Sequence, residues 1–198
     1  MMCKRLLDLF GGLVGLLVLS PVFLIISLLI KADSPGSVFF RQTRVGKGGR
    51  LFSIHKFRTM ISSQTVNAPL ITVGRDPRIT RVGQFLREHK LDELPQLIDV
   101  LFGTMSLVGP RPEVEKYVAL YPAEIKELVL GVRPGLTDRA SIEFKDETKL
   151  LAECDDPERA YVEQILPRKL AYYCEYVKHS NCWLDLQIIF LSLVALMK

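Results

Sequence analysis

Cysteine and histidine are scarce in this sequence, with four cysteines and three histidines in 198 residues. No two cysteines form a CxxC pair, and their spacing does not match a disulfide framework, so a small secreted disulfide-bonded domain is excluded. Cys174, His179 and Cys182 are close in sequence, but a fourth ligand of the usual kind for structural zinc is missing from that neighbourhood. We therefore interpret the cysteines as ordinary residues of a protein in a reducing compartment.

Internal repeats and low-complexity tracts are also missing, and the composition excludes a disordered chain. Apolar residues make up 48% of the sequence and charged residues 24%, as in folded proteins. The length suits one compact domain, which we assign to residues 1–198. The mean hydropathy of +0.21 is high for a soluble protein, and the apolar excess is concentrated at the two ends of the chain.

Acidic residues are few in the first half of the chain. Residues 1–90 contain 14 Lys or Arg and four Asp or Glu, a net charge of +10, whereas the remainder carries −6. A basic half suits anionic partners such as lipid head groups, phosphates or nucleic acid, although a solvated basic face has the same composition. A nucleic-acid binder is less favoured, because the sequence has no recognition-helix signature and no aromatic residues interleaved with the basic ones.

The N-terminal segment at 9–30 has no charged residue and is flanked by Lys4, Arg5 and Lys31. As a straight helix it would be about 33 Å long, close to the hydrocarbon thickness of a bilayer. It is too long for a typical signal peptide and lacks a clear cleavage site. Ser20-Pro21 lies in its middle and predicts a kink, where the serine hydroxyl can bind a freed carbonyl. Positive charge on both flanks selects no orientation, so a bent re-entrant helix and a spanning helix both fit.

The rest of the chain predicts short strands followed mainly by helices. Alternating residues at 37–44 and 51–58 predict two strands, and the glycine-rich connection at 45–50 favours a hairpin over a phosphate cradle. A polar surface loop is expected at 62–76. Helical patterns follow at 80–91, 95–108, 114–130, 157–176 and 183–197, the last with Trp183 as an interfacial anchor.

The adjacent carboxylates Asp92 and Glu93 are the strongest candidates for chemistry. On a helix they would point about 100° apart, which favours unlike roles, one facing a phosphorus atom and the other managing a proton or a metal. An isolated Asp-Glu pair is usually only a solvated helix end. Here arginines, which bind phosphate oxygens bidentately, precede and follow the pair. They are Arg75, Arg78, Arg81 and Arg87 before it, and Arg111 and Arg133 in Pro/Gly turns after it.

Six ordered motifs across nearly the whole chain resemble the bacterial sugar transferase family, the monotopic phosphoglycosyl transferases. They are the Ser-Pro apolar N-terminus, FRQTRVG at 40–46, KFRTM at 56–60, TRVG at 80–83, LDELPQ at 91–96 and SLVGPRPE at 106–113. The short chain is similar to minimal members that consist of little more than the catalytic domain.

The resemblance implies a two-step transfer of a phosphosugar from a UDP-sugar to polyprenyl (undecaprenyl) phosphate. Asp92 would attack the β-phosphate and release UMP, and the lipid phosphate would then attack the covalent intermediate. Glu93 would assist proton transfer or position Mg²⁺, with Asp92 also at the metal. The phosphate contacts would be Lys56, Arg58, Arg87, Arg111 and Arg133.

The resemblance also implies a fold and a location. The fold class is then α+β, mainly helical with a small β-hairpin, with residues 1–31 as a re-entrant membrane helix bent at Ser20-Pro21 and further interfacial amphipathic helices. The location would be the bacterial inner membrane with the active site on the cytoplasmic face. The expected partners are the UDP-sugar, the polyprenyl phosphate and membrane lipids, with no nucleic acid.

One departure from the family pattern concerns Asp138-Arg139, which follow Arg-Pro-Gly-Leu-Thr where a glycine and a tryptophan are usual. Two charges there are expected to alter the sugar or nucleotide pocket. The sequence sets neither the donor sugar nor the oligomeric state. The competing hypothesis is a basic, peripheral membrane-binding protein without chemistry, in which the arginines meet anionic lipid only.

Overall fold

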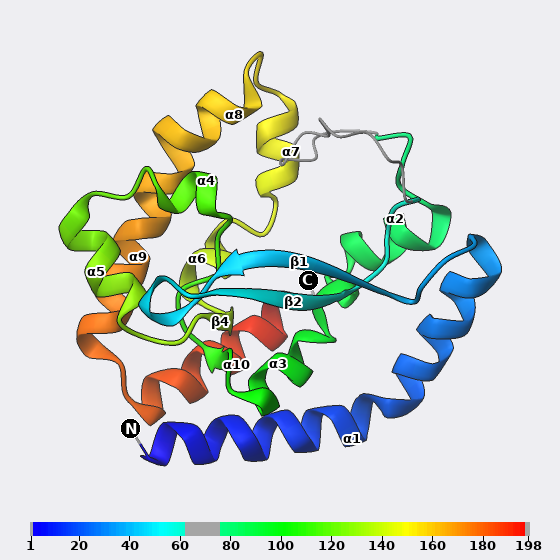
Figure 1. Ribbon diagram of the computed structural model, residues 1–198, viewed down its shortest axis with the longest axis horizontal. Helices are drawn as coiled ribbons and strands as arrows, with labels where there is room; N and C mark the ends of the chain where they lie inside the picture. Colours follow the sequence, from blue (N-terminus) through cyan, green and yellow to red (C-terminus); the bar gives the residue numbers. More distant parts are fainter. Residues whose placement is uncertain (1, 62–75, 197–198) are drawn as a thin grey trace.

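A computed structural model describes residues 2–61 and 76–196. The predicted class is confirmed: the protein is mainly helical with a small antiparallel hairpin, and a long apolar helix stands at the N-terminus. In Figure 1, α1 (Met2–Asp33) follows one edge of the molecule and then bends upward, while α7 (Glu147–Ala152) and α8 (Pro157–Ala160) lie at the opposite edge. The loop expected at 62–76, with Arg75, lies outside the described residues apart from Asp76.

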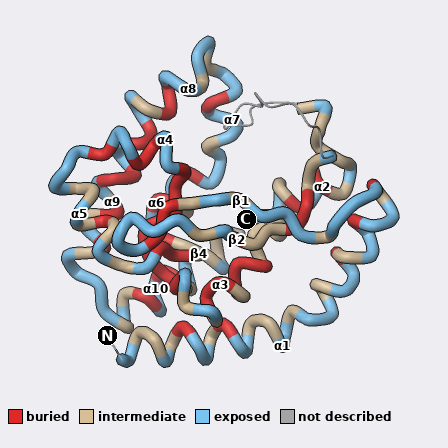
Figure 2. Tube along the Cα trace, viewed as in Figure 1, coloured by how far each residue is buried: buried red, intermediate tan, exposed pale blue. Residues whose placement is uncertain are grey.

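The α1 helix exposes most of its apolar side chains. Of the described helices, it alone is long and apolar enough to cross a membrane, and only 11% of its most apolar window is buried. Figure 2 shows the helix largely exposed. It remains helical through Pro21, and the Ser20 hydroxyl donates to the carbonyl of Leu17 at 2.8 Å. That carbonyl is the one that the missing N–H of proline would have bonded, so the predicted back-bonding at Ser20-Pro21 is confirmed.

Polar residues fasten the start of α1 to the rest of the protein. The buried Asp8 carboxylate accepts hydrogen bonds from the Ser106 hydroxyl and the Leu107 N–H, both at 2.9 Å. Lys4 binds Asp185 at 2.7 Å, which ties α1 to the C-terminal helix α10 (Cys182–Leu196). Because lone charges in apolar surroundings are costly, these paired contacts define where α1 docks.

The predicted hairpin is confirmed, with β1 (Phe39–Val45) antiparallel to β2 (Leu51–Phe57) and Phe39 opposite Phe57. Gly48 and Gly49 at its tip have φ of 67° and 75°, values that favour glycine. A second sheet was not predicted: β3 (Ser106–Val108) pairs in parallel with β4 (Gly135–Thr137). Each strand has three residues, too few for an alternating pattern to be visible in the sequence.

Several helix predictions were wrong in extent. The helix expected at 95–108 ends as α3 (Gln96–Phe102) because Gly103 adopts a left-handed conformation, and β3 follows. The helix expected at 114–130 is two helices, α4 (Glu115–Val118) and α5 (Ala123–Leu130), because Pro122 interrupts the hydrogen-bond ladder. The segment at 157–176 is helical as predicted, as α8, a π-helical turn η3 (Tyr161–Ile165) and α9 (Leu166–His179). The short helices α6 (Arg139–Glu143) and α7 were missed.

The main hydrophobic core lies away from α1, between α4, α5, α6 and α9. Tyr117, Val129, Ala140, Leu170 and Tyr173 are among its buried members. Figure 2 shows buried segments gathered there and along α3. A smaller cluster joins the second half of α1 to the hairpin, through Ile26, Ile30, Phe57 and Leu86. The main core therefore forms without residues of α1, and the second half of that helix packs through the smaller cluster.

Candidate active site

Asp92 and Glu93 lie on η2 (Leu91–Glu93), one turn of 3-10 helix between α2 (Arg81–Glu88) and α3. Thr80 caps the start of α2 by accepting from the Gly83 N–H at 2.9 Å. Lys90 then has a φ of 55°, an uncommon conformation for a residue with a side chain, and it turns the chain into η2. On a 3-10 helix successive side chains point about 120° apart, so the two carboxylates face different surroundings.

Glu93 is engaged by two cations from different parts of the chain. Its Oε1 atom accepts from Lys56 Nζ of β2 at 2.7 Å and from the guanidinium of Arg111 in the loop after β3. Burial opposes ionisation of Glu93, but the charges of Arg111 and Lys56 hold its pKa well below the usual range. Glu93 is therefore a fixed negative charge that holds the two cations in place.

Asp92 is partly exposed and is not engaged in this way. Within the described part of the chain, no hydrogen bond or ion pair to its carboxylate is present. Burial and the neighbouring charge of Glu93 raise its pKa, against the opposing influence of Lys56, Arg87 and Arg111. Among the described residues, the pair thus consists of a tied carboxylate and an open one, and the prediction that they have unlike roles stays a prediction.

The loop that carries Arg111 is held by close backbone contact between two glycine motifs. Gly109 donates to the Thr137 carbonyl at 3.1 Å, and Gly135 donates to the Pro110 carbonyl at 2.9 Å. A Cβ atom on Gly135 would lie 2.1 Å from the Gly109 nitrogen, so only glycine allows this approach. The motifs at 106–113 and 133–137 therefore form one backbone unit that presents Arg111 to Glu93.

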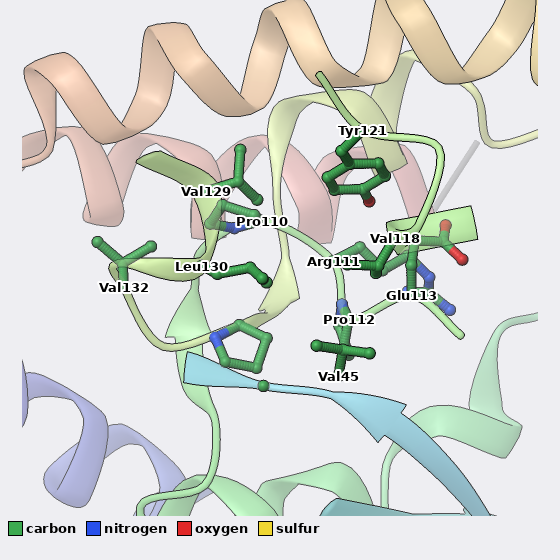
Figure 3. A pocket seen from close by; sticks show the side chains of 12 residues that line it. Val45, Pro110, Arg111, Pro112, Glu113, Val118, Tyr121, Val129, Leu130 and Val132 are labelled. Atoms are coloured by element: carbon green, nitrogen blue, oxygen red, sulfur yellow. The ribbon is translucent and has the colours of Figure 1, made fainter. Parts of the chain in front are cut away.

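Glu113 anchors the far side of the same loop, although sequence reasoning assigned it no role. Its buried carboxylate accepts from Tyr161 Oη at 2.6 Å and pairs with Arg44 at 3.4 Å. Figure 3 shows Arg111 and Glu113 among the residues that line one pocket. That pocket is a cavity of about 10 Å³, far below the several hundred that a ligand site needs, so it is a packing feature. The sequence offered only an acid two residues after Arg111, and its burial could not be read from the sequence.

Of the predicted phosphate contacts, Lys56 and Arg111 contact Glu93, and the charge of Arg87 lowers the Asp92 pKa from nearby. The structure places the other two elsewhere. Arg58 is buried and donates to the carbonyls of Ser34 and Pro35, just after the end of α1. Its donors serve that helix end in place of phosphate, as cationic side chains commonly do. Arg133 is exposed and lines a hollow beside the hairpin tip at 46–50. The sequence could not distinguish Arg58 and Arg133 from the cations that lie near the dyad, because residue type alone does not show where a side chain points.

The remaining arginines before the dyad do not form one cluster. Arg78 is bound to both carboxylate oxygens of Asp76, and this contact lowers the Asp76 pKa to about 2. Arg81 is exposed at the start of α2. Only Arg87 of the described residues in this group influences Asp92.

The unusual residues Asp138 and Arg139 have structural contacts. Asp138 is buried and caps α6, accepting from the Ser141 N–H at 3.0 Å and from the Ser141 hydroxyl at 2.5 Å. Burial raises the Asp138 pKa despite these bonds. Arg139 points to the surface, where it pairs with Glu175 at 3.1 Å. An altered sugar pocket at these positions stays a prediction.

The donor set near the dyad suits a magnesium ion only with help from phosphate. In the described residues, no group of three or more His, Cys, Asp or Glu side chains could hold a metal. Because Glu93 already binds two cations, the open Asp92 is the main protein ligand available. Magnesium commonly binds one or two carboxylates together with substrate phosphates and water, and this arrangement fits that pattern.

The dyad is connected to the apolar helix by packing. Leu91 and Leu94, on either side of the carboxylates, pack against the cluster that contains Ile26 and Ile30 of α1. The turn that holds Asp92 therefore shares one packed cluster with the second half of α1.

Comparisons with known proteins agree with the motifs. Residues 1–198 match the family model described as bacterial sugar transferase. A UDP-glucose:undecaprenyl-phosphate glucose-1-phosphate transferase of Escherichia coli (strain K12) is 37% identical over 192 residues, which cover 96% of this chain and 39% of the relative. A UDP-N-acetylgalactosamine-undecaprenyl-phosphate N-acetylgalactosaminephosphotransferase of Aeromonas hydrophila is 36% identical over 194 residues, 94% of this chain and 42% of the relative.

A third relative is similar in length. The exopolysaccharide production protein PSS of Rhizobium leguminosarum bv. phaseoli is 39% identical over 198 residues, 97% of this chain and 94% of the relative. The chain thus spans about two fifths of the transferases from the other two organisms and nearly all of the Rhizobium protein.

Proposed function

Because the chain belongs to the bacterial sugar transferase family, we propose that it transfers a phosphosugar from a UDP-sugar to polyprenyl phosphate, the first membrane step of glycan assembly. The observation that carries the proposal is the contrast within the dyad. Glu93 is tied by Lys56 and Arg111, whereas Asp92 beside it is open and lies within the influence of three cations.

In the first step, a carboxylate oxygen of Asp92 attacks the β-phosphorus of the UDP-sugar. The bond from that phosphorus to the oxygen bridging the two phosphates breaks, and UMP leaves with the bridging oxygen and its electron pair. The phosphosugar is then held as an aspartyl phosphate, a type of intermediate that carboxylate nucleophiles form. Lys56, Arg87 and Arg111 neutralise charge on the phosphate oxygens, since transfer at phosphorus depends mainly on positioning and electrostatics.

In the second step, a phosphate oxygen of the polyprenyl phosphate attacks the same phosphorus. The bond to Asp92 breaks, which regenerates the carboxylate and gives the polyprenyl diphosphosugar. A phosphate monoester has a second pKa near 6, so the acceptor needs little help from a general base at neutral pH. Of the two roles expected for Glu93, proton transfer or the positioning of Mg²⁺, proton transfer fits poorly, because the charges of Arg111 and Lys56 keep Glu93 ionised.

Magnesium is part of the proposal on chemical grounds. Asp92 and Glu93 would hold the ion together with the diphosphate, with Asp92 as the main protein ligand. The ion would supply further neutralisation of charge on the leaving UMP. The protein itself contributes to charge neutralisation by holding Lys56 and Arg111 at the Glu93 carboxylate.

We place α1 in the inner membrane as a re-entrant helix, with the dyad on the cytoplasmic side. Support comes from its exposed apolar surface, the bend that Figure 1 shows, and the Ser20–Leu17 hydrogen bond that makes an interrupted ladder tolerable in lipid. The packing of Leu91 and Leu94 on α1 would keep Asp92 near the bilayer surface. There a lipid phosphate and a soluble nucleotide sugar can both reach it.

The test is an intact-mass measurement on detergent-solubilised protein incubated with a panel of UDP-sugars, Mg²⁺ and no lipid acceptor. A phosphosugar adduct is expected with the correct donor, and it should disappear in Asp92→Asn and be discharged by polyprenyl phosphate. Full turnover by Asp92→Asn would overturn the proposal. A protein that binds anionic lipid equally well with and without Asp92 and forms no adduct would instead be the basic membrane-binding protein.

A further inference from the structure

A basic groove lies at the tip of the β1–β2 hairpin, at the other end of β2 from Lys56. Three cationic side chains line it, Lys47 and Arg50 from the hairpin and Arg133 from the loop before β4. Gly46, Gly48, Phe52, Gly103 and Thr104 complete the lining of what we call the hairpin groove, whose volume is about 440 Å³. Lys56 follows Arg50 by six positions along extended chain, a distance of about 20 Å, so the groove is distinct from the dyad.

The positive charge of the hairpin groove is not neutralised within the described residues. No acidic residue is among those that line it, and none of its three cations takes part in an ion pair with another described residue. By contrast, Lys4, Lys56 and Arg111 are each paired with a carboxylate. Three convergent unpaired cations around a hollow are what a phosphate group requires.

The groove lies beside the first turns of α1. Its wall at Gly103 and Thr104 follows directly on α3, and Arg5 of α1 donates to the last carbonyls of that helix, at 2.8 Å to Val100 and 2.9 Å to Leu101. The Arg5 guanidinium also touches Gly103, since a Cβ atom there would lie 3.1 Å from it. The adjoining Phe102 side chain is 75% exposed. With α1 in lipid, the groove therefore opens at the level of the head groups, next to an exposed aromatic side chain.

We propose that the hairpin groove binds the phosphate head group of an anionic membrane lipid, at a site separate from Asp92 and Glu93. The proposal rests on the membrane placement of α1 in the proposed function, but not on the chemistry of the dyad. Lys47, Arg50 and Arg133 bind the phosphate, and Phe52 and Phe102 offer apolar surface beside it. Such a contact would fix the rotation of the catalytic part about α1 and hold the hairpin that carries Lys56 against the membrane.

Native mass spectrometry of the full chain in detergent tests this, with titration of phosphatidylglycerol, phosphatidylcholine or glycerol 3-phosphate. Wild type is expected to retain phosphatidylglycerol in preference to the other two. In Lys47→Gln/Arg50→Gln the affinity should fall about 25-fold, since one basic side chain near an anionic surface contributes roughly a factor of five. In Arg133→Gln, a change on a different segment of the chain, the affinity for phosphatidylglycerol should fall about fivefold.

The matched control is Lys31→Gln/Lys178→Gln. These lysines are exposed, Lys31 in the last turn of α1 and Lys178 in the last turn of α9, just before α10. Their substitution changes the net charge equally, but they lie outside the groove. The control should bind phosphatidylglycerol within about twofold of wild type. Equal losses in the control and hairpin variants, or no loss in the hairpin and Arg133 variants, would overturn the site. Binding of glycerol 3-phosphate as tight as that of the lipid would overturn the lipid assignment.

The intact-mass assay separates this proposal from the proposed function. Lys47 and Arg50 take no part in the dyad, so their double variant should form the phosphosugar adduct at the wild-type rate in detergent while it loses the lipid. A wild-type protein that retains the lipid selectively but forms no adduct would support the lipid site in the groove and overturn the proposed transferase function.

Discussion

Lys56 and Arg111 bind the same oxygen of Glu93. Lys56 lies on β2 of the hairpin, whereas Arg111 lies in the loop after β3, a strand of the other sheet. This shared contact joins the hairpin, the dyad and the glycine-rich loop in one electrostatic unit. Its consequence is that Glu93 and Asp92 should respond in opposite ways to pH and to neutral substitution, and this difference is measurable.

Glu93→Gln should slow adduct formation by about 100-fold, because the two cations lose the charge that positions them. It should also shift the pH profile. Burial and the Glu93 charge both raise the Asp92 pKa, so removing that charge lowers it while Lys56 and Arg111 remain nearby. The acid limb of the rate should therefore move to lower pH. Glu124→Gln, an exposed control, should change neither; a profile that stays in place in Glu93→Gln would show that the carboxylates are not coupled.

Asp92→Asn should stabilise the protein while it abolishes transfer. A carboxyl whose folded-state pKa is raised is less favourably ionised in the folded protein, so at neutral pH its charge costs stability. We expect a gain of about 1 kcal/mol in the free energy of unfolding at pH 7, which vanishes as the pH falls below the pKa of the unfolded carboxyl. Denaturant unfolding in detergent at several pH values measures this.

The matched comparison is Glu93→Gln, where the sign is reversed. The Glu93 pKa is lowered in the folded state, so its contribution to stability is present above the unfolded pKa and is lost as the pH falls. That variant should be less stable than wild type at pH 7, with the difference shrinking in acid. A loss of stability in Asp92→Asn at neutral pH would contradict the raised folded-state pKa of Asp92.

Gly135→Ala should unfold the loop that presents Arg111. The new Cβ atom would lie 2.1 Å from the Gly109 nitrogen and 2.4 Å from its carbonyl oxygen, both backbone atoms that cannot move alone. We expect a loss of about 3 kcal/mol in stability, together with strongly reduced adduct formation. In Gly131→Ala the nearest atom would be at 3.2 Å with no positive φ, so that variant should lose clearly less stability than Gly135→Ala. Equal stability of both variants would refute the tight contact.

The sequence predicted the elements that have long or distinctive patterns. The apolar run predicted α1, and the alternation around Gly46 to Gly49 predicted the hairpin. The helix expected at 80–91 ends earlier, as α2 at Glu88, and the 3-10 turn that carries Asp92 was not predicted. What it missed is short or depends on distant partners. The strands β3 and β4 have three residues each, and their pairing depends on the contact between Gly109 and Gly135, 26 positions apart.

The roles of the arginines show the same limit. Lys56 and Arg111 contact Glu93, but Arg58 in the same KFRTM motif as Lys56 binds carbonyls after the end of α1. Neighbouring residues on a strand point to opposite faces, so Lys56 and Arg58 share a face only if the strand continues. The strand β2 ends at Phe57, and the direction of Arg58 is then set by the chain that follows α1.

Oxidation should link Cys3 to Cys182. Their sulfur atoms lie 2.7 Å apart, where the starts of α1 and α10 meet next to the Lys4–Asp185 ion pair. Brief treatment with copper-phenanthroline in membranes is expected to give an intramolecular disulfide, detected by peptide mapping without reduction. Cys154 and Cys174, which have no such neighbour among the described residues, serve as internal controls and should remain free. An unlinked Cys3 would mean that α1 does not dock on α10 in the membrane.

The bend of α1 depends on Ser20 and Pro21, and each makes a separate prediction. Ser20→Ala leaves the Leu17 carbonyl without a partner and should cost about 1 kcal/mol. Ser27→Ala is the matched control: its hydroxyl also donates one turn back, to Phe23 at 2.6 Å, but the backbone N–H of Ser27 is present to bond the same carbonyl. That variant should lose less. Thermal unfolding in detergent compares the two.

Pro21→Leu restores the missing N–H and should straighten α1, so that part of the population spans the membrane. The reporter is Cys3 in a chain whose other cysteines are serine, treated with an impermeant maleimide. When Pro21 is kept, we expect Cys3 to be labelled from the cytoplasmic side alone. In Pro21→Leu a fraction should become accessible from the other side, because the positive flanks do not favour one orientation. Lys31→Cys reports the second flank and should stay cytoplasmic in both. Labelling of Cys3 from the far side in the Pro21 protein would exclude the re-entrant helix.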